Sequence, residues 1–301
     1  MTAFFDVFTD MTVCGGPVRH YRGGRRGAPP LLLLHGAMLD TAAGVWRDVA
    51  APLADEFEVH AIDLPRHGGS RPWRGTLDNR FFMTFLEALL DRLELQRVAL
   101  VGLSMGGGIA TSFALEQPQR VSALCAIGPG GLGARRDHQF LTWLFMKTPG
   151  ALRLTTRYLA RSPRAIAASM RTHLVAGADT PGFSSILAEA TAEAQRKHRH
   201  REPALDDWQV AAYGPRAMRL DLLPHLDRLA VPTLWMRGER DPLVGHREMA
   251  LAADRAPGSR LVTVSDAGHV VPYDQPEAFA SLARAFLTET LNGGRERPGG
   301  A

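Results

Sequence analysis

The chain alternates short apolar segments with segments of helical apolar spacing, and this pattern constrains its fold more than any other feature. Strands are predicted over residues 17–23, 30–36, 56–65, 97–103, 121–129, 231–242 and 259–269. Helices are predicted over residues 45–54, 77–93, 105–117, 246–255 and 276–291. Because successive parallel strands need crossover helices, the alternation predicts an α/β fold. Its sheet is expected to be mostly parallel and twisted, with helices on both faces.

The alternation stops after the strand predicted to end at residue 129. Residues 131–213 carry helical patterns and no convincing strand, and strands resume at residue 231. We therefore expect a core built from residues 1–130 and 214–292, interrupted by a helical insertion over 131–213. A polar, glycine-rich tail over 293–301 is expected to be disordered.

Composition excludes several classes of protein. The N-terminus lacks a basic region and carries Asp6 and Asp10, so no signal peptide is expected, and no apolar run is long enough to cross a bilayer. Cys14 and Cys125 form neither a metal-ligand spacing nor a disulfide framework, which indicates the cytoplasm. Residues 135–201 hold 12 Lys and Arg against 4 Asp and Glu. No nucleic-acid motif accompanies this charge, so no nucleic-acid partner is expected.

A serine with glycines on both sides is the first candidate for a catalytic residue. Ser104 stands in Gly102-Leu103-Ser104-Met105-Gly106, between a predicted strand and a predicted helix. The pattern G-x-S-x-G at this place is typical of a nucleophile elbow, a strained turn that tolerates only small neighbours and exposes the serine oxygen. A glycine-rich turn used for packing or for phosphate binding is the alternative.

A nucleophilic serine needs a base and an orienting carboxylate. Of the 11 histidines, His269 follows the last predicted strand and so lies at the sheet edge where Ser104 lies. Asp241 follows the strand before it, and the order Ser104, Asp241, His269 fits this type of sheet. Glu239 is a rival for the carboxylate, and a helix-capping role is the alternative for Asp241.

The same edge offers two backbone N–H groups for an oxyanion. Met105 opens the helix behind Ser104, and Ala37 lies in the loop after the predicted strand 30–36. Donors of this kind are each worth about 3 kcal/mol of barrier. We predict that the N–H groups of Ala37 and Met105 form an oxyanion hole.

Five segments carry a resemblance. The stretches LLLLHGAM, AIDLPRHGGS, VGLSMGG, MRGERDP and DAGHVVPYDQPEAF together resemble the α/β-hydrolase fold superfamily. The resemblance implies a Ser-His-Asp hydrolase acting on a carbonyl group, a lid formed by the insertion, and no metal or organic cofactor. Arg66 stands where the usual D-x-P-G-H-G-x-S pattern has glycine.

The substrate is harder to predict. The simplest expectation is a small-molecule carboxylic ester, small or medium and apolar, cleaved through an acyl-enzyme. Phe140, Trp143 and Leu144 form part of an apolar stretch that either lines the substrate pocket or packs the lid, and Val270 follows the predicted base. We predict these four as substrate-binding residues. Arginines at 153, 157, 161 and 164 follow one helical face, which is either solvated or attracts anionic substrates or surfaces.

Two other functions remain open. The stretch IGPGGLG, residues 127–133, is similar to meta-cleavage product hydrolases, which cut a C–C bond in ring-fission dienoates. That group typically has Asn where Leu103 stands and Trp where Val270 stands. A binding protein, an acyltransferase or a perhydrolase on the same scaffold is the third possibility.

Overall fold

The computed structural model describes residues 4–293. Within them, eight strands form one sheet in the order β1-β2-β4-β3-β5-β6-β7-β8. β1 and β2 pair antiparallel, β2 is antiparallel to β4, and all later neighbours are parallel. The predicted α/β fold with a mostly parallel sheet is confirmed. The strands are β1 (Phe8–Val13), β2 (Gly16–Gly23), β3 (Pro30–Leu34), β4 (Glu58–Ile62), β5 (Val98–Leu103), β6 (Val121–Ile127), β7 (Thr233–Gly238) and β8 (Arg260–Val264).

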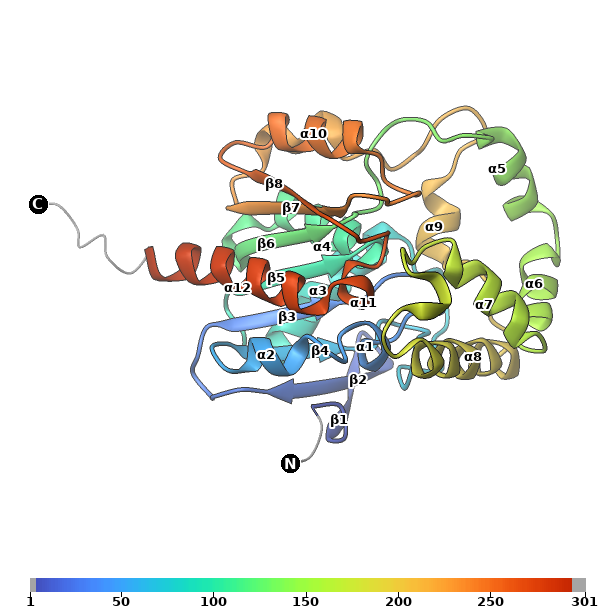
Figure 1. Cartoon of the computed structure of the whole chain (residues 1–301), viewed down its shortest axis with the longest axis horizontal. Coiled ribbons are helices and arrows are strands. Elements are labelled where there is room, and N and C mark those ends of the chain that lie inside the picture. The colour runs from blue at the N-terminus through green and yellow to red at the C-terminus, as the bar shows by residue number, and fades with distance from the viewer. Residues whose placement is uncertain (1–3, 294–301) are drawn as a thin grey trace, which may run out of the picture.

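Helices cover both faces of the sheet, and β3 shows why its sequence is continuously apolar. Leu32 and Leu34 pack into one core cluster, whereas Leu31 and Leu33 pack into the other. The first cluster includes α3, α4 and α10, and the second includes α1, α2 and α12 (Figure 1). These helices and the short α11 are α1 (Ala42–Val45), α2 (Ala50–Ala54), α3 (Asn79–Arg92), α4 (Met105–Glu116), α10 (His246–Arg255), α11 (Val271–Asp274) and α12 (Pro276–Gly293).

An edge strand and a helix of the core differ from the sequence prediction, and the short α11 was not predicted. β1 was not predicted, because this edge strand is largely exposed and its pairing with β2 rather than its own apolar pattern defines it. The helix predicted over 45–54 forms two short helices, α1 and α2. Pro52 has no N–H to continue a helical ladder there. The tail predicted over 293–301 lies outside the described residues, except for Gly293, which ends α12.

Between β6 and β7 the chain is helical, and these helices gather at one end of the sheet (Figure 1). They are α5 (Gln139–Lys147), α6 (Ala151–Leu159), α7 (Pro163–Arg171), α8 (Phe183–Arg199) and α9 (Asp207–Ala212). No helix among residues 4–293 is long and apolar enough to cross a membrane.

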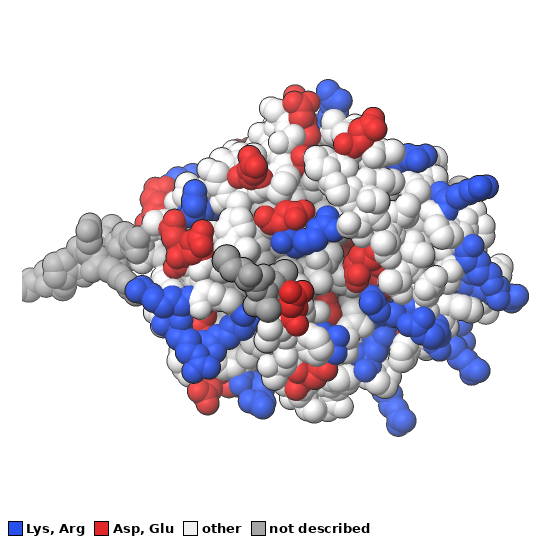
Figure 2. All heavy atoms as spheres, turned by 60° about the horizontal axis from the view of Figure 1, so that its bottom comes forward, with Lys and Arg blue, Asp and Glu red and all other residues white. Residues whose placement is uncertain are grey.

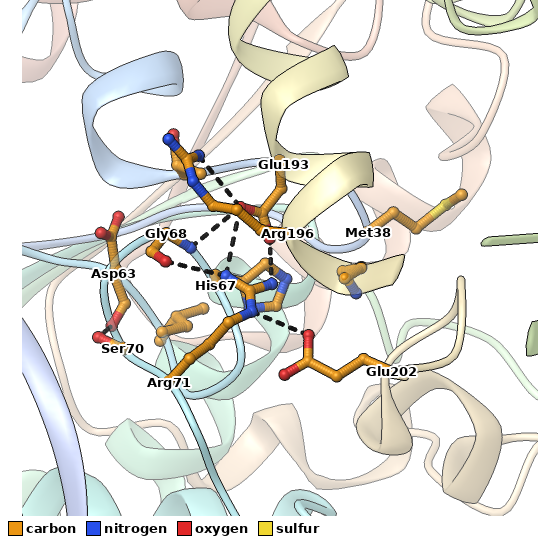
Figure 3. Close-up of polar contacts among 12 residues, drawn as sticks. Met38, Asp63, His67, Gly68, Ser70, Arg71, Glu193, Arg196 and Glu202 are labelled. Carbon is orange, nitrogen blue, oxygen red and sulfur yellow. Dashed lines mark hydrogen bonds and ion pairs between the residues drawn. The ribbon is translucent and has the colours of Figure 1, made fainter. Parts of the chain in front are cut away.

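Buried ion pairs join α8 to the loop that follows β4 (Figure 3). The side chain of Arg71, only 3% exposed, pairs with Glu193 of α8, and its Nε lies 2.9 Å from Oε2 of Glu202. Glu193 also accepts a hydrogen bond from the N–H of Gly68 at 3.2 Å. Leaving one of these buried charges without its partner costs about 3–5 kcal/mol. The network therefore holds α8 against the core.

Candidate active site

Ser104 lies in a strained turn between β5 and α4. Its backbone has φ 52° and ψ −114°, a combination that few residues with a side chain adopt. A Cβ atom on Gly102 would lie 2.5 Å from the carbonyl oxygen of Gly106, and one on Gly106 would lie 2.3 Å from that of Leu34. Both glycines are therefore required by the turn, as the sequence pattern predicts.

Asp241 and His269 meet at the end of two neighbouring parallel strands. Asp241 follows β7, His269 follows β8, and Nδ1 of His269 lies 2.9 Å from Oδ2 of Asp241. The other oxygen of Asp241 accepts hydrogen bonds from the N–H groups of Leu243 and Val244, at 2.8 and 3.1 Å. Burial raises the pKa of Asp241, but the hydrogen bonds and His269 outweigh it, so the net pKa is lowered. The residue is therefore a carboxylate at neutral pH. The rival Glu239 is exposed.

The backbone around His269 fixes the ring. Its N–H donates to the carbonyl oxygen of His173 at 3.1 Å. Gly128 leaves room for the pair, since a Cβ there would lie 2.9 Å from Oδ2 of Asp241 and 3.2 Å from Nδ1 of His269. Nε2 of His269 is buried and has no hydrogen-bond partner within residues 4–293. His269 and Ser104 line the same two cavities, so this unpaired nitrogen and the serine share one site.

The loop after β3 runs beside Ser104. A Cβ on Gly36 would lie 3.5 Å from that of Ser104, and Ala37 lines a cavity together with the serine. Met38 has a positive φ of 64°, and its N–H donates to Oδ2 of Asp206 at 2.7 Å. Among the described residues, no hydrogen bond is made by the N–H of Ala37 or of Met105. Both predicted oxyanion donors are thus unpaired.

Asp206 itself lies close to two further side chains. Its Oδ1 lies 2.7 Å from Nζ of Lys197, and its Oδ2 lies 3.4 Å from Nε2 of His67. Burial raises the pKa of Asp206, but Lys197 and His67 more than compensate and hold it well below the usual range. A buried carboxylate therefore anchors the loop that contains Ala37.

Two cavities flank Ser104 and His269. The first, of about 170 Å³, is mainly apolar, and its lining includes Met170, Leu174, Ala190, Leu243, Val270 and Tyr273. The second, of about 360 Å³, is lined in part by Met105, Gly130, Arg136, Trp208, Tyr213 and Met218. A reacting group at Ser104 thus has room on both sides.

The predicted substrate-binding residues divide between two places. Val270 lines the first cavity. Phe140, Trp143 and Leu144 line neither cavity that contains Ser104. Phe140 and Leu144 are 55% and 47% exposed, because α5 buries Gln139 and Met146 and turns these side chains to solvent. These three residues were predicted to bind substrate, but the structure places them outside both cavities at Ser104.

The structure adds residues that the sequence analysis did not select. Asp40 lines the first cavity with Ser104 and His269. Burial raises its pKa to about 6, although His269 and His67 act in the opposite direction. Asp206 was missed because its partner Met38 lies 168 residues away in the chain.

No group of three or more His, Cys, Asp or Glu side chains that could hold a metal occurs in the described part of the chain.

Comparison with known proteins identifies the family. The model of the alpha/beta hydrolase fold matches residues 29–276. The pimeloyl-[acyl-carrier protein] methyl ester esterase of Aeromonas salmonicida is 28% identical over 265 residues, which are 86% of this chain and 95% of that protein.

Solved structures share the fold. A thermophilic esterase from Thermogutta terrifontis superposes with a TM-score of 0.75 at 24% identity, over 94% of this chain and 99% of that one. The 2-hydroxy-6-oxo-6-phenylhexa-2,4-dienoate hydrolase of a Rhodococcus strain gives 0.71 at 18% identity, over 95% and 98%. The chain belongs to the alpha/beta hydrolase fold family.

Proposed function

We propose that the protein hydrolyses carboxylic esters, with Ser104 as nucleophile, His269 as general base and Asp241 as the carboxylate that orients it. The observation that carries the proposal is the 2.9 Å contact between His269 and Asp241 beside the strained turn of Ser104. The esterase relative from Aeromonas salmonicida supports an ester as the substrate.

The proposed reaction starts from neutral His269. Because Asp241 accepts a hydrogen bond from Nδ1–H, the free Nε2 takes the proton of Ser104 as its oxygen attacks the ester carbonyl. The tetrahedral intermediate collapses when Nε2 returns that proton to the leaving alcohol. A water molecule then gives a proton to Nε2, attacks the acyl-enzyme and releases the acid, and Ser104 recovers its proton.

The N–H groups of Ala37 and Met105 are the proposed donors to the oxyanion. Met105 is the first residue of α4, so its N–H has no partner within the helix. The partial positive charge at a helix N-terminus also favours an anion. The anchoring of Met38 by Asp206 keeps the neighbouring Ala37 in place.

The size of the cavities supports a small or medium substrate. A cavity of about 170 Å³ with an apolar lining suits a short acyl or alkyl group. No step of the proposed reaction requires a metal or an organic cofactor.

The two cysteines are both free, in keeping with the cytoplasm as the proposed compartment.

Hydrolysis of p-nitrophenyl esters from acetate to decanoate tests the proposal. We expect hydrolysis with a preference for the shorter chains. Ser104→Ala is expected to lower kcat/KM by about 10³-fold or more. Ser112→Ala is the matched control, since Ser112 is buried in α4 away from both cavities.

Two results would overturn the ester proposal. If the wild type leaves every ester intact but cleaves a ring-fission dienoate, the protein is a C–C hydrolase. The carboxyl group of Asp40 argues against an anionic group in the first cavity, because two like charges would meet there, whereas Arg136 lines the second cavity. If neither class reacts, a binding protein, an acyltransferase or a perhydrolase is the remaining function.

A further inference from the structure

Helices α5 and α6 present large apolar side chains to solvent. Ten such side chains are exposed in the described part of the chain, and six of them lie on these two successive helices. We call the six the α5–α6 face: Phe140, Leu141, Leu144, Phe145, Leu154 and Tyr158. Exposed apolar groups gathered in this way mark a surface that contacts another apolar phase or partner.

The surroundings of the α5–α6 face are cationic. Lys147, Arg153, Arg157, Arg161 and Arg164 are exposed, and no described carboxylate lies within 4 Å of them. Residues 138–178 contain no Asp or Glu. Figure 2 shows Lys and Arg side chains gathered at the end of the molecule where Figure 1 places α5 to α8. The partner must therefore be both apolar and negatively charged.

Two open hollows beside the α5–α6 face are also lined by cationic side chains. One of about 540 Å³ is lined in part by Lys147, Arg153 and Arg201, and one of about 310 Å³ by Arg153, Arg157 and Arg201. Glu202 lines both hollows and Asp207 lines the larger one, but Glu202 is paired with Arg71 and Asp207 with Arg66. Phosphate groups fit such sites, because guanidinium groups bind phosphate oxygens in pairs.

We propose that the α5–α6 face binds the surface of an anionic lipid bilayer. The six apolar side chains enter the boundary between head groups and acyl chains, and the cations around them contact lipid phosphates. Each helix has nine residues, so the contact is peripheral and does not span the bilayer. The proposal does not depend on the reaction at Ser104.

The shape and charge of the face favour lipid over protein partners. A second copy of this chain would bring the same cations together. Of the six apolar side chains, only Leu154 lines a hollow, and α5 and α6 form the outer edge of the molecule (Figure 1). Protruding side chains need a complementary surface on a folded protein partner, whereas the fluid boundary of a bilayer accommodates them without one.

Sedimentation of the full chain with lipid vesicles tests the proposal. We expect binding to phosphatidylcholine vesicles that contain phosphatidylglycerol, weak binding to phosphatidylcholine alone, and loss of binding at high salt. Leu141→Gln with Phe145→Gln, and separately Arg153→Gln with Arg157→Gln, should each weaken binding by about ten-fold. Val7→Gln with Leu251→Gln, and Arg92→Gln with Arg247→Gln, are the matched controls at exposed sites elsewhere.

Tryptophan fluorescence locates the contact. Four of the five tryptophans are buried, at 9% exposure or less, and only Trp143 on α5 is partly exposed. Lipids brominated on the acyl chain should quench the fluorescence, and Trp143→Phe should remove that quenching. Circular dichroism of each variant shows that it is folded.

Three outcomes would overturn the proposal. The first is absence of binding to anionic vesicles at low salt. The second is an equal effect of the control variants. The third is binding that the Leu141 and Phe145 changes leave intact, because the contact would then be electrostatic and suited to any polyanion, an acidic protein included.

Discussion

Asp206 accepts a hydrogen bond from the N–H of Met38 at 2.7 Å, across 168 residues of sequence. The contact joins Asp206, the N-cap residue of α9, to the loop in which the preceding N–H, that of Ala37, is a proposed oxyanion donor. Lys197, whose Nζ lies 2.7 Å from Oδ1, holds the carboxylate in place. We therefore regard Asp206 as a positioning residue for the oxyanion hole.

Replacing Asp206 should impair turnover more than binding. We expect Asp206→Ala to lower kcat on a p-nitrophenyl ester by about 10- to 100-fold with little change in KM, because the donor moves relative to the transition state. Asp206→Asn keeps an oxygen for Met38 and should restore part of kcat. Asp207→Ala is the control, since Asp207 pairs with Arg66 and not with the Met38 loop. A rise in KM alone would contradict the positioning role.

Exchanging Asp241 for its amide tests the proposed orientation of His269. Asp241→Asn keeps the size of the side chain but no longer favours the Nδ1–H form of the ring. We expect kcat/KM to fall by about 10²- to 10⁴-fold. Glu239→Gln, at the rival carboxylate that the structure leaves exposed, should change it little. Equal losses in both variants would argue against Asp241 as the orienting residue.

The carboxyl group of Asp40, a half-buried residue that lines the first cavity, should make stability depend on pH. Burial raises its pKa to about 6 in the folded chain from an ordinary value of 3.8, so folding favours the protonated form. This contribution to stability is complete below pH 3.8 and is lost as the pH rises through 6.

Asp40→Asn removes that dependence. The Tm of the variant relative to the wild type should rise by about 2–5 °C between pH 4.5 and pH 7.5. Asp48→Asn, at an exposed carboxylate, is the matched control. Thermal unfolding followed by circular dichroism measures both. A constant difference for Asp40→Asn would mean that its carboxyl group titrates normally.

Local sequence pattern was sufficient to predict the central sheet. β3 and β5 are buried on both faces, so their residues are apolar throughout and the strands are visible without any partner. β1 is different, because its burial is slight and its hydrogen bonds to β2 define it. Ser104, Asp241 and His269 were selected because each follows a predicted strand, and parallel strands end at the same edge.

Residues whose environment depends on the packing of the insertion were not predictable in this way. Asp206 and Arg71 are ordinary surface types in sequence, and only the docking of the segment around α8 buries them. The apolar stretch on α5 led to the opposite error. Its spacing is that of a helix with a buried face, but the structure buries the side of Met146 and exposes Phe140 and Leu144. Sequence period alone does not say whether an apolar face has a partner.

The first cavity should set the preferred acyl length. Met170 lies in α7 and lines this cavity beside Ser104 and His269. Met170→Ala removes three heavy atoms, so we expect the optimum in the p-nitrophenyl series to move to chains longer by about two carbons. Met146→Ala is the matched control, since Met146 is buried on α5 and lines neither cavity that contains Ser104. An unchanged optimum in Met170→Ala would place the acyl group in the second cavity, where Met218→Ala should then produce the shift.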